Sequence, residues 1–248
     1  MVAPRILMTA VRVAASTLFL MPATSFLDSS LDSAFASPAK PGVTQQTKSK
    51  FSYVPPNRGT PRRTQATGSR GCTEAAPVKL ALLVPNDHTA QTSLGHPTFF
   101  WNISEKPEQP LEFALVESGI AKPIFVQQVQ VENAGIAKLE MPSNLPELVP
   151  GKEYRWSVTL ICNKNRRSND TFVQSWIKRV ARSPQVEEKL TAATSDRDRA
   201  SVYAEAGLWF DALNAISSNS SKDEFMLLLD QVGLSEVAVQ DRQTVARQ

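Results

Sequence analysis

Between residues 78 and 180, hydrophobic and polar residues alternate with a period of two, which is typical of strands buried on one face. The runs are short, and Pro, Gly and Asn separate them. They predict seven strands, at Val78–Val84, Pro97–Ile103, Leu111–Glu117, Ile124–Val131, Ile136–Met141, Glu153–Cys162 and Thr171–Val180. Short strands at this spacing favour an antiparallel β-sandwich over residues 72–182.

The segment from Leu148 to Val158 adds a more specific signal. A Pro150-Gly151 turn precedes Tyr154 and Trp156, which alternate along the best strand of the chain. This spacing resembles the late strands of an immunoglobulin-like or fibronectin-like sandwich, where such residues fill the core between the sheets. The resemblance implies a fold and no function.

After Arg182 the period changes to that of helices. Ser183-Pro184 is a typical helix start, and an amphipathic segment from Asp223 to Val232 ends at Gly233. Between them, the spacing of Ala200, Tyr203, Gly207, Trp209, Ala212 and Leu213 resembles one tetratricopeptide repeat. We therefore expect an α+β protein with a short helical region at 183–240, containing one such hairpin, and a tail at 241–248.

Several aromatic residues could serve as packing or docking positions. Tyr203 and Trp209 are expected to fill the seam between their own helices. Phe210 or the face carrying Phe225 would then pack on the sandwich or form a partner surface. Phe100 must point opposite to its strand neighbours, so it is either covered by the C-terminal helices or exposed to a partner.

The N-terminus has the order of a secretory signal over residues 1–36. A basic start precedes an apolar run, and small residues end at Ala34-Phe35-Ala36; cleavage after Ser25 is the second choice. The alternative is an amphipathic N-terminus of a cytosolic protein. No later apolar run is long enough for a bilayer span, so we expect a secreted or periplasmic protein without a transmembrane anchor.

Residues 37–71 are rich in Pro, Thr, Gln, Gly and Ser, and contain seven basic and no acidic residues. This composition predicts a disordered basic linker. It is either a plain tether or a means of holding an anionic polysaccharide, a lipid headgroup layer or an acidic protein, with Phe51 and Tyr53 as contact points. The formal charge of the whole chain is only +3, and we expect no nucleic-acid partner.

The chain has two cysteines, Cys72 and Cys162. Export would allow them to form a disulfide, which would stabilise the fold by roughly 4 to 5 kcal/mol. The alternative is a nucleophilic thiol, which the predicted position of Cys162 on the apolar face of a strand does not favour.

Together these features resemble a known family. The residues that carry the resemblance are the signal, Arg70-Gly71-Cys72, Leu80-Ala81-Leu82 with Pro85, His96–Trp101, Leu148 with Gly151, Tyr154 and Trp156, Cys162, Trp176–Val180 and Tyr203–Leu213. Over about Gly71 to Leu234 they resemble the cyanobacterial secreted family catalogued as domain of unknown function 928. The resemblance implies export and no reaction.

Several groups of polar residues could form a chemical site. Asp87, His88 and His96 with Glu74 or Asn86 could bind a metal, Ser93 near His88 could serve a hydrolase, and Glu140 and Glu153 could form a glycosidase pair. Asn163–Arg167 could bind an anion. In each case the ordinary structural role is favoured, so we expect no catalytic, cofactor-binding or metal-binding residue.

Two functions follow as hypotheses. The first is a non-enzymatic binding or assembly module of the cell envelope, with an envelope protein or an anionic polysaccharide as partner, because sandwiches and helical hairpins act mostly through surfaces. The alternative is a hydrolase acting on an envelope polymer.

Overall fold

The computed structural model describes residues 51–56, 64–66, 72, 78–218 and 222–237. All of them belong to one compact unit, residues 48–248. The predicted signal peptide and the tail at 241–248 lie outside the described residues.

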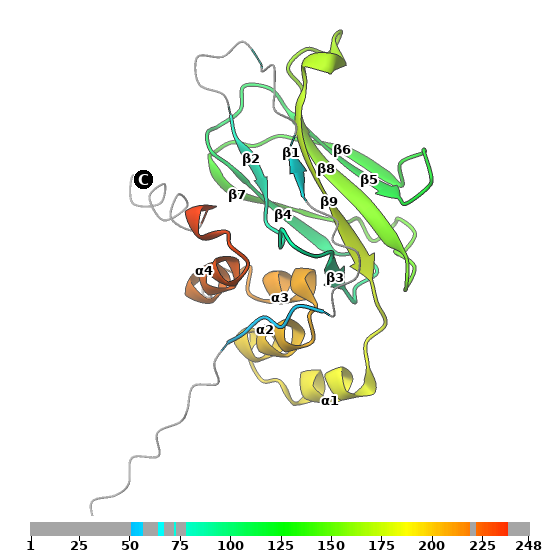
Figure 1. Ribbon diagram of the computed structural model, residues 1–248, viewed down its shortest axis with the longest axis vertical. Coiled ribbons are helices and arrows are strands. Elements are labelled where there is room, and N and C mark those ends of the chain that lie inside the picture. Colours follow the sequence, from blue (N-terminus) through cyan, green and yellow to red (C-terminus); the bar gives the residue numbers. More distant parts are fainter. Residues whose placement is uncertain (1–50, 57–63, 67–71, 73–77, 219–221, 238–248) are drawn as a thin grey trace, which may run out of the picture. The chain divides into compact units, whose positions relative to one another are not determined.

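The described strands form two sheets (Figure 1). The path through the first sheet is β1 (Gln65–Ala66), β9 (Thr171–Arg179), β8 (Glu153–Leu160), β5 (Leu111–Glu117) and β6 (Phe125–Val129), and β3 (Ala90–Thr92) also pairs with β9. The second sheet has the order β2 (Leu80–Leu82), β4 (Thr98–Ile103) and β7 (Gly135–Glu140).

All seven predicted strands are present, with ends that differ by up to a few residues. Two further strands, β1 and β3, were not predicted, and β3 runs parallel to β9. The first sheet is therefore mixed rather than purely antiparallel. With only two and three residues, β1 and β3 are too short to show a hydrophobic period.

Strand β4 is buried along its whole length, because both of its faces are covered. On one face, Phe99 packs between the sheets against Phe113 and Trp156, with ring centroids 4.8 and 5.0 Å apart. On the other face, Phe100 meets Phe225 of the helical region at 5.7 Å. Consecutive residues of one strand thus join the core of the sheets to the helices.

The helices labelled in Figure 1 gather at one end of the sheets: α1 (Pro184–Ala192), α2 (Asp196–Glu205), α3 (Trp209–Ala215) and α4 (Lys222–Gln231). Ser183 caps α1, and Ser195 forms a capping box with Asp198 at α2. Gly207 turns the chain between α2 and α3 with a φ of +75°, where a left-handed residue is required.

The helices share their core with the sheets. Phe210 of α3 contacts both Phe99 and Trp156, at centroid distances of 5.8 and 6.2 Å. The helical residue therefore reaches the aromatic cluster between the two sheets, and the helical region is part of the fold rather than a tail. In the described part of the chain, no helix is long and apolar enough to cross a bilayer.

Candidate functional site

An extended segment, Phe51–Pro56, is docked on the helical region, and we call it the strap. It runs beside α2 in Figure 1, where it is drawn in blue. The strap lies within the predicted disordered linker, and that prediction is wrong for these residues. The prediction of disorder also fails at Gln65 and Ala66, because these residues form β1.

Backbone hydrogen bonds hold the strap to two helices. The Val54 N–H donates to the carbonyl of Ala204 in α2 at 3.0 Å. The side-chain amide of Gln231 in α4 accepts from the Tyr53 N–H at 2.7 Å and donates to the Phe51 carbonyl at 3.2 Å. Gln231 therefore pairs with the strap as a neighbouring β-strand would, through one donor and one acceptor.

Gly207 lets the strap approach the α2–α3 turn. A Cβ atom at this position would lie 3.1 Å from the Val54 carbonyl oxygen and 3.3 Å from Pro56. The glycine thus serves two purposes, since it also has a positive φ. We call the surface formed by Ala204, Gly207, Trp209, Gln231 and His88 the strap groove.

Tyr53 is the buried anchor of the strap, with 6% of its surface exposed. Its ring meets Trp209 edge-on at 4.9 Å and stacks beside His88 at 5.7 Å. The indole N–H of Trp209 donates in turn to the Leu83 carbonyl at 2.8 Å. Trp209 therefore contacts the strap and the chain segment after β2, while Tyr203 is only half-buried.

Tyr53, His88 and Asp87 form a hydrogen-bonded row. The Tyr53 hydroxyl lies 2.7 Å from Nε2 of His88, and Nδ1 of His88 lies 2.7 Å from the Asp87 carboxylate. Asp87 selects the tautomer with a proton on Nδ1, which leaves Nε2 to accept from the phenol. Burial, followed by the charge of Asp87, raises the pKa of Tyr53 well above its ordinary value of 10.0.

The row has the order of a catalytic triad, but its hydroxyl is poorly suited to nucleophilic attack. A nucleophile needs a lowered pKa or a base that takes its proton readily, and burial acts in the opposite direction here. The row instead fixes the strap to the loop before β3. A cavity of about 380 Å³ borders it, lined by Tyr53, Pro55, Asn86, Asp87, His88, Gln231 and Val232.

The predicted metal residues make separate contacts. His88 bonds to Tyr53 and Asp87, whereas Nε2 of His96 lies 2.8 Å from the Leu145 carbonyl oxygen. Within the described residues, no group of three His, Cys, Asp or Glu side chains could hold a metal ion. Glu74 lies outside these residues.

Ser93 belongs to a buried network that the sequence did not reveal. Its backbone N–H lies 3.1 Å from both carboxylate oxygens of Asp211, and its hydroxyl donates to the same carboxylate. Arg182 donates to the Ser93 hydroxyl at 2.9 Å. Burial raises the pKa of Asp211. The network joins β3, α3 and the segment leading into α1, and no signal in the spacing of these residues marked it.

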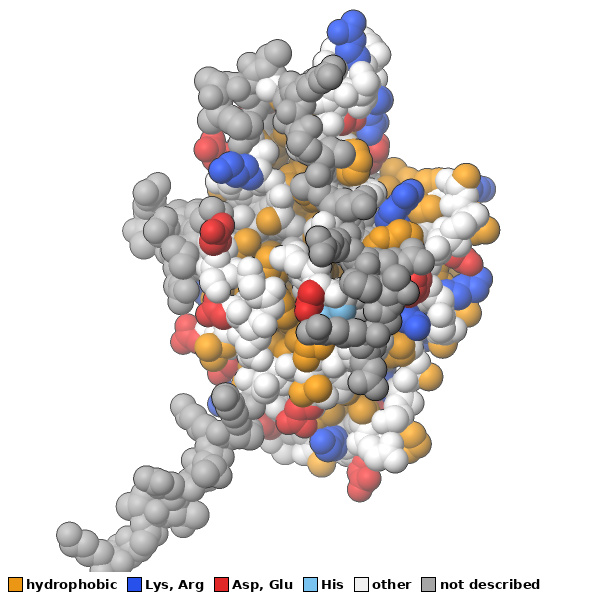
Figure 2. Space-filling view, in the orientation of Figure 1, with side chains coloured by type: hydrophobic (Ala, Val, Ile, Leu, Met, Phe, Trp, Pro, Cys, Tyr) orange, Lys and Arg blue, Asp and Glu red, His pale blue; other side chains and the backbone are white. Residues whose placement is uncertain are grey.

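The other polar candidates are also separated. Glu140 is on β7 and Glu153 on β8, in different sheets. In the basic loop, Arg167 pairs with Glu112 at 2.7 Å and with Asp170. On the face drawn in Figure 2, the described basic and acidic side chains are interspersed.

The three residues considered as a partner surface are buried. Phe100, Phe210 and Phe225 expose 2%, 1% and 6% of their surfaces. Of the two alternatives for these residues, the structure has the buried one, and Phe100 is covered by Phe225 of α4. Their apolar area is used to join the helices to the sheets.

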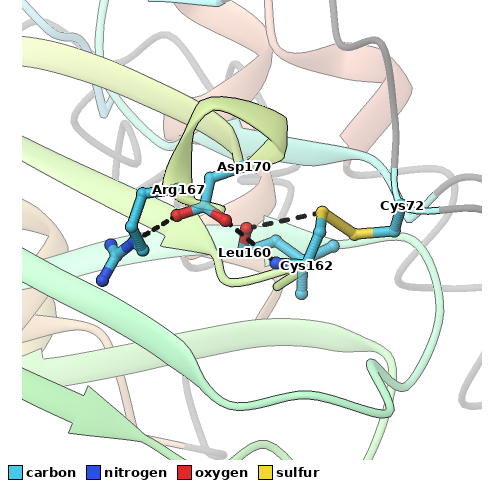
Figure 3. The surroundings of a disulfide bond; sticks show 5 residues. All are labelled: Cys72, Leu160, Cys162, Arg167 and Asp170. Atoms are coloured by element: carbon cyan, nitrogen blue, oxygen red, sulfur yellow. Dashed lines mark hydrogen bonds and ion pairs between the residues drawn. A yellow bond between two sulfur atoms is a disulfide. The ribbon is translucent and has the colours of Figure 1, made fainter. Parts of the chain in front are cut away.

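The predicted disulfide between Cys72 and Cys162 is present, with Cα atoms 5.0 Å apart (Figure 3). Cys162 lies two residues after the end of β8, not on the strand face that the alternation suggested. Its N–H donates to Asp170 at 3.0 Å, and Asp170 also pairs with Arg167. The disulfide thus ties Cys72, which lies between β1 and β2 in the sequence, to the loop between β8 and β9.

A family model described as domain of unknown function 928 matches residues 65–242. The chain belongs to this family. The match begins at β1, so the strap lies just before the segment that defines the family. No curated protein matches the chain.

Proposed function

We propose that this member of the family is an exported binding or assembly module of the cell envelope, and that the strap groove is its binding element. The observation that carries the proposal is the strap itself, an extended segment held through its backbone by Ala204 and Gln231. Recognition of extended peptides through backbone hydrogen bonds, with a pocket for one side chain, is a recurring mode of protein binding.

In this proposal, the strap is the resident ligand of the groove. Partner proteins would present a similar extended segment, with an aromatic residue in place of Tyr53. The contacts of Gln231 and Ala204 tolerate many sequences because they reach only the peptide backbone. The Tyr53 pocket, formed by Trp209 and His88, would supply the selectivity.

The finer fold assignments belong to the same proposal. The two sheets would be an immunoglobulin-like or fibronectin-like sandwich, and α2 with α3 a single tetratricopeptide-like hairpin. Fully buried Ala200 and Ala204 in α2 support the hairpin assignment. A lone repeat cannot bury a continuous core, and here the sheets would take the place of the neighbouring repeats.

Export is supported by the disulfide, since such bonds persist in oxidising compartments. The proposal predicts that the mature chain begins near Ser37 and is recovered from the periplasm or the medium. N-terminal sequencing of that protein is the test. A soluble native protein that retains Met1 would contradict export.

Peptide binding is tested by supplying the strap as a separate molecule. The mature chain with residues 51–56 replaced by Gly and Ser is titrated with a fluorescent peptide of residues 50–57, and anisotropy is measured. We expect saturable binding, weakened by Gln231→Ala and abolished when Tyr53 of the peptide is replaced by Ala. The unlabelled peptide should then displace envelope partners captured by the same chain.

An intact chain gives a second measurement in case the altered chain does not fold. Gly207→Ala should loosen the strap and speed hydrogen exchange of the Tyr53 and Val54 amides. Gly233→Ala is the matched control, because Gly233 has a φ of +80° but open space around a new Cβ atom. Equal exchange in the two variants, together with no peptide binding, would show that the groove is not a binding element.

A further inference from the structure

A second pocket lies away from the strap groove, at the seam between the second sheet and the helical region. It encloses about 290 Å³. Its apolar lining comes from Phe100 of β4, Ile136 of β7, Ile216 after α3, and Phe225 and Met226 of α4. Phe100 and Phe225 meet edge-on within this lining, so the apolar floor is fixed by the same contact that joins the sheet to the helix.

The polar lining of the pocket combines two lysines with two serines. The described lining has four polar side chains, Lys138, Ser217, Ser218 and Lys222. The two lysine ammonium groups act only as hydrogen-bond donors, whereas the Ser217 hydroxyl already donates to the Asn214 carbonyl at 3.0 Å. Lys138 lies directly opposite Phe100 in the register of β4 and β7, which places its charge beside the apolar floor. The Lys138 ammonium also lies 3.3 Å from the Glu140 carboxylate.

We propose that this pocket binds a small amphiphilic anion, a carboxylate on a short alkyl chain. The apolar floor would remove the alkyl chain from water, and the donors would satisfy the carboxylate oxygens through charge-assisted hydrogen bonds. The volume lies near the lower end of the roughly 300–1,000 Å³ usual for small-molecule sites. This size favours a short-chain ligand over a complete lipid. The proposal does not depend on the strap groove.

The test uses the mature full chain with octanoate and with 1-octanol, which has the same chain length and no charge. Isothermal titration should show octanoate binding about tenfold more tightly than octanol. Lys138→Ala and Lys222→Ala should each weaken octanoate about two- to fivefold, as expected for partly exposed ion pairs, and leave octanol unchanged. Lys164→Ala, in the loop after β8, is the control and should change neither ligand.

A variant that fills the pocket distinguishes binding inside it from nonspecific binding to the rest of the surface. Ile136→Trp should abolish binding of both ligands, and nuclear magnetic resonance of the Ile136 and Met226 methyl groups in the unaltered chain should show shifts with octanoate. Equal affinity for octanol, unchanged octanoate affinity in both lysine variants, or unshifted methyl groups would overturn the proposal. Binding to anionic vesicles without binding of free octanoate would also overturn it and indicate a membrane surface instead.

Discussion

The Tyr53 hydroxyl lies 2.7 Å from Nε2 of His88, which makes one strap residue a link between the loop before β3 and the helices. The same ring contacts Trp209 of α3. A residue that touches both parts contributes to their mutual packing as well as to its own burial. The strap is therefore expected to be part of the cooperative fold.

Removing only the hydroxyl, by Tyr53→Phe, should lower the free energy of unfolding by about 0.5 to 1.5 kcal/mol, the usual net effect of one hydrogen bond. Tyr53→Ala should cost about 3 to 5 kcal/mol, because it empties a buried aromatic site. Urea denaturation of the mature chain measures both. Val54→Ala is the control, since the Val54 side chain is half-exposed; a loss as large as that of Tyr53→Ala would contradict this assignment.

Loss of the disulfide should destabilise the protein without changing its architecture. The bond joins residues 90 positions apart, and the chain-entropy relation gives roughly 4 to 5 kcal/mol for a loop of this length. The double variant Cys72→Ala and Cys162→Ala should unfold at a correspondingly lower urea concentration. Mass spectrometry of an unreduced digest establishes the bond in the native protein, and two separately alkylated thiols would contradict it.

Asp211 should make stability depend on pH in a defined direction. Burial raises its pKa in the folded state above the ordinary 3.8, so the folded chain binds more protons than the unfolded chain between these two values. The stabilisation that Asp211 contributes to the folded state is fully present below its pKa in the unfolded chain. This stabilisation is lost as pH rises through the raised pKa of the folded state. Above about pH 4, the free energy of unfolding should fall more with pH in the wild type than in Asp211→Asn.

Asp198 is a control for Asp211, because its pKa is shifted in the opposite direction. Hydrogen bonds from Ser195 and Thr194 lower its pKa, so its contribution is lost as pH falls. Urea titrations at a series of pH values give the free energy of unfolding as a function of pH. Asp198→Asn and Asp211→Asn should change the slope of this dependence in opposite directions. Parallel curves for the wild type and Asp211→Asn would contradict the role of burial.

The helical region should unfold together with the sheets. Trp209→Ala should cost about 3 to 5 kcal/mol and Phe225→Ala a similar amount, because both side chains are buried in the shared core. Leu227→Ala is the control on the same helix as Phe225, since 51% of the Leu227 surface is exposed, and it should stay within about 0.5 kcal/mol. A chain ending at Arg182 that melts like the wild type would refute the shared core.

Periodicity predicted the long elements well because each buries one regular face. β8 alternates buried and partly exposed positions over its whole length, and Ser183-Pro184 marks the start of α1 as expected. Periodicity predicted the strand β4 but not the burial of both of its faces. An isolated strand pattern shows that Phe100 points away from Phe99, but only the tertiary structure shows that α4 lies over it.

The candidate site was missed for a different reason. The strap has six residues in a polar, proline-rich background, and its backbone partners lie far away in the chain. Composition predicts disorder when a segment cannot bury enough apolar surface. Because it is a mean over the whole segment, it does not show that two aromatic residues, Phe51 and Tyr53, are buried. Phe51 and Tyr53 were recognised as contact points, but their partner is the protein's own helical region.

The Gln231 amide joins the strap across 178 residues of sequence at Tyr53 and 180 at Phe51. Contacts between residues so far apart form late, because a long loop must close before they contribute. During synthesis, the strap segment has no Gln231 to bind until α4 has been made. The strap would thus remain accessible to other proteins until α4 has folded, and strap docking would report that α4 is in place.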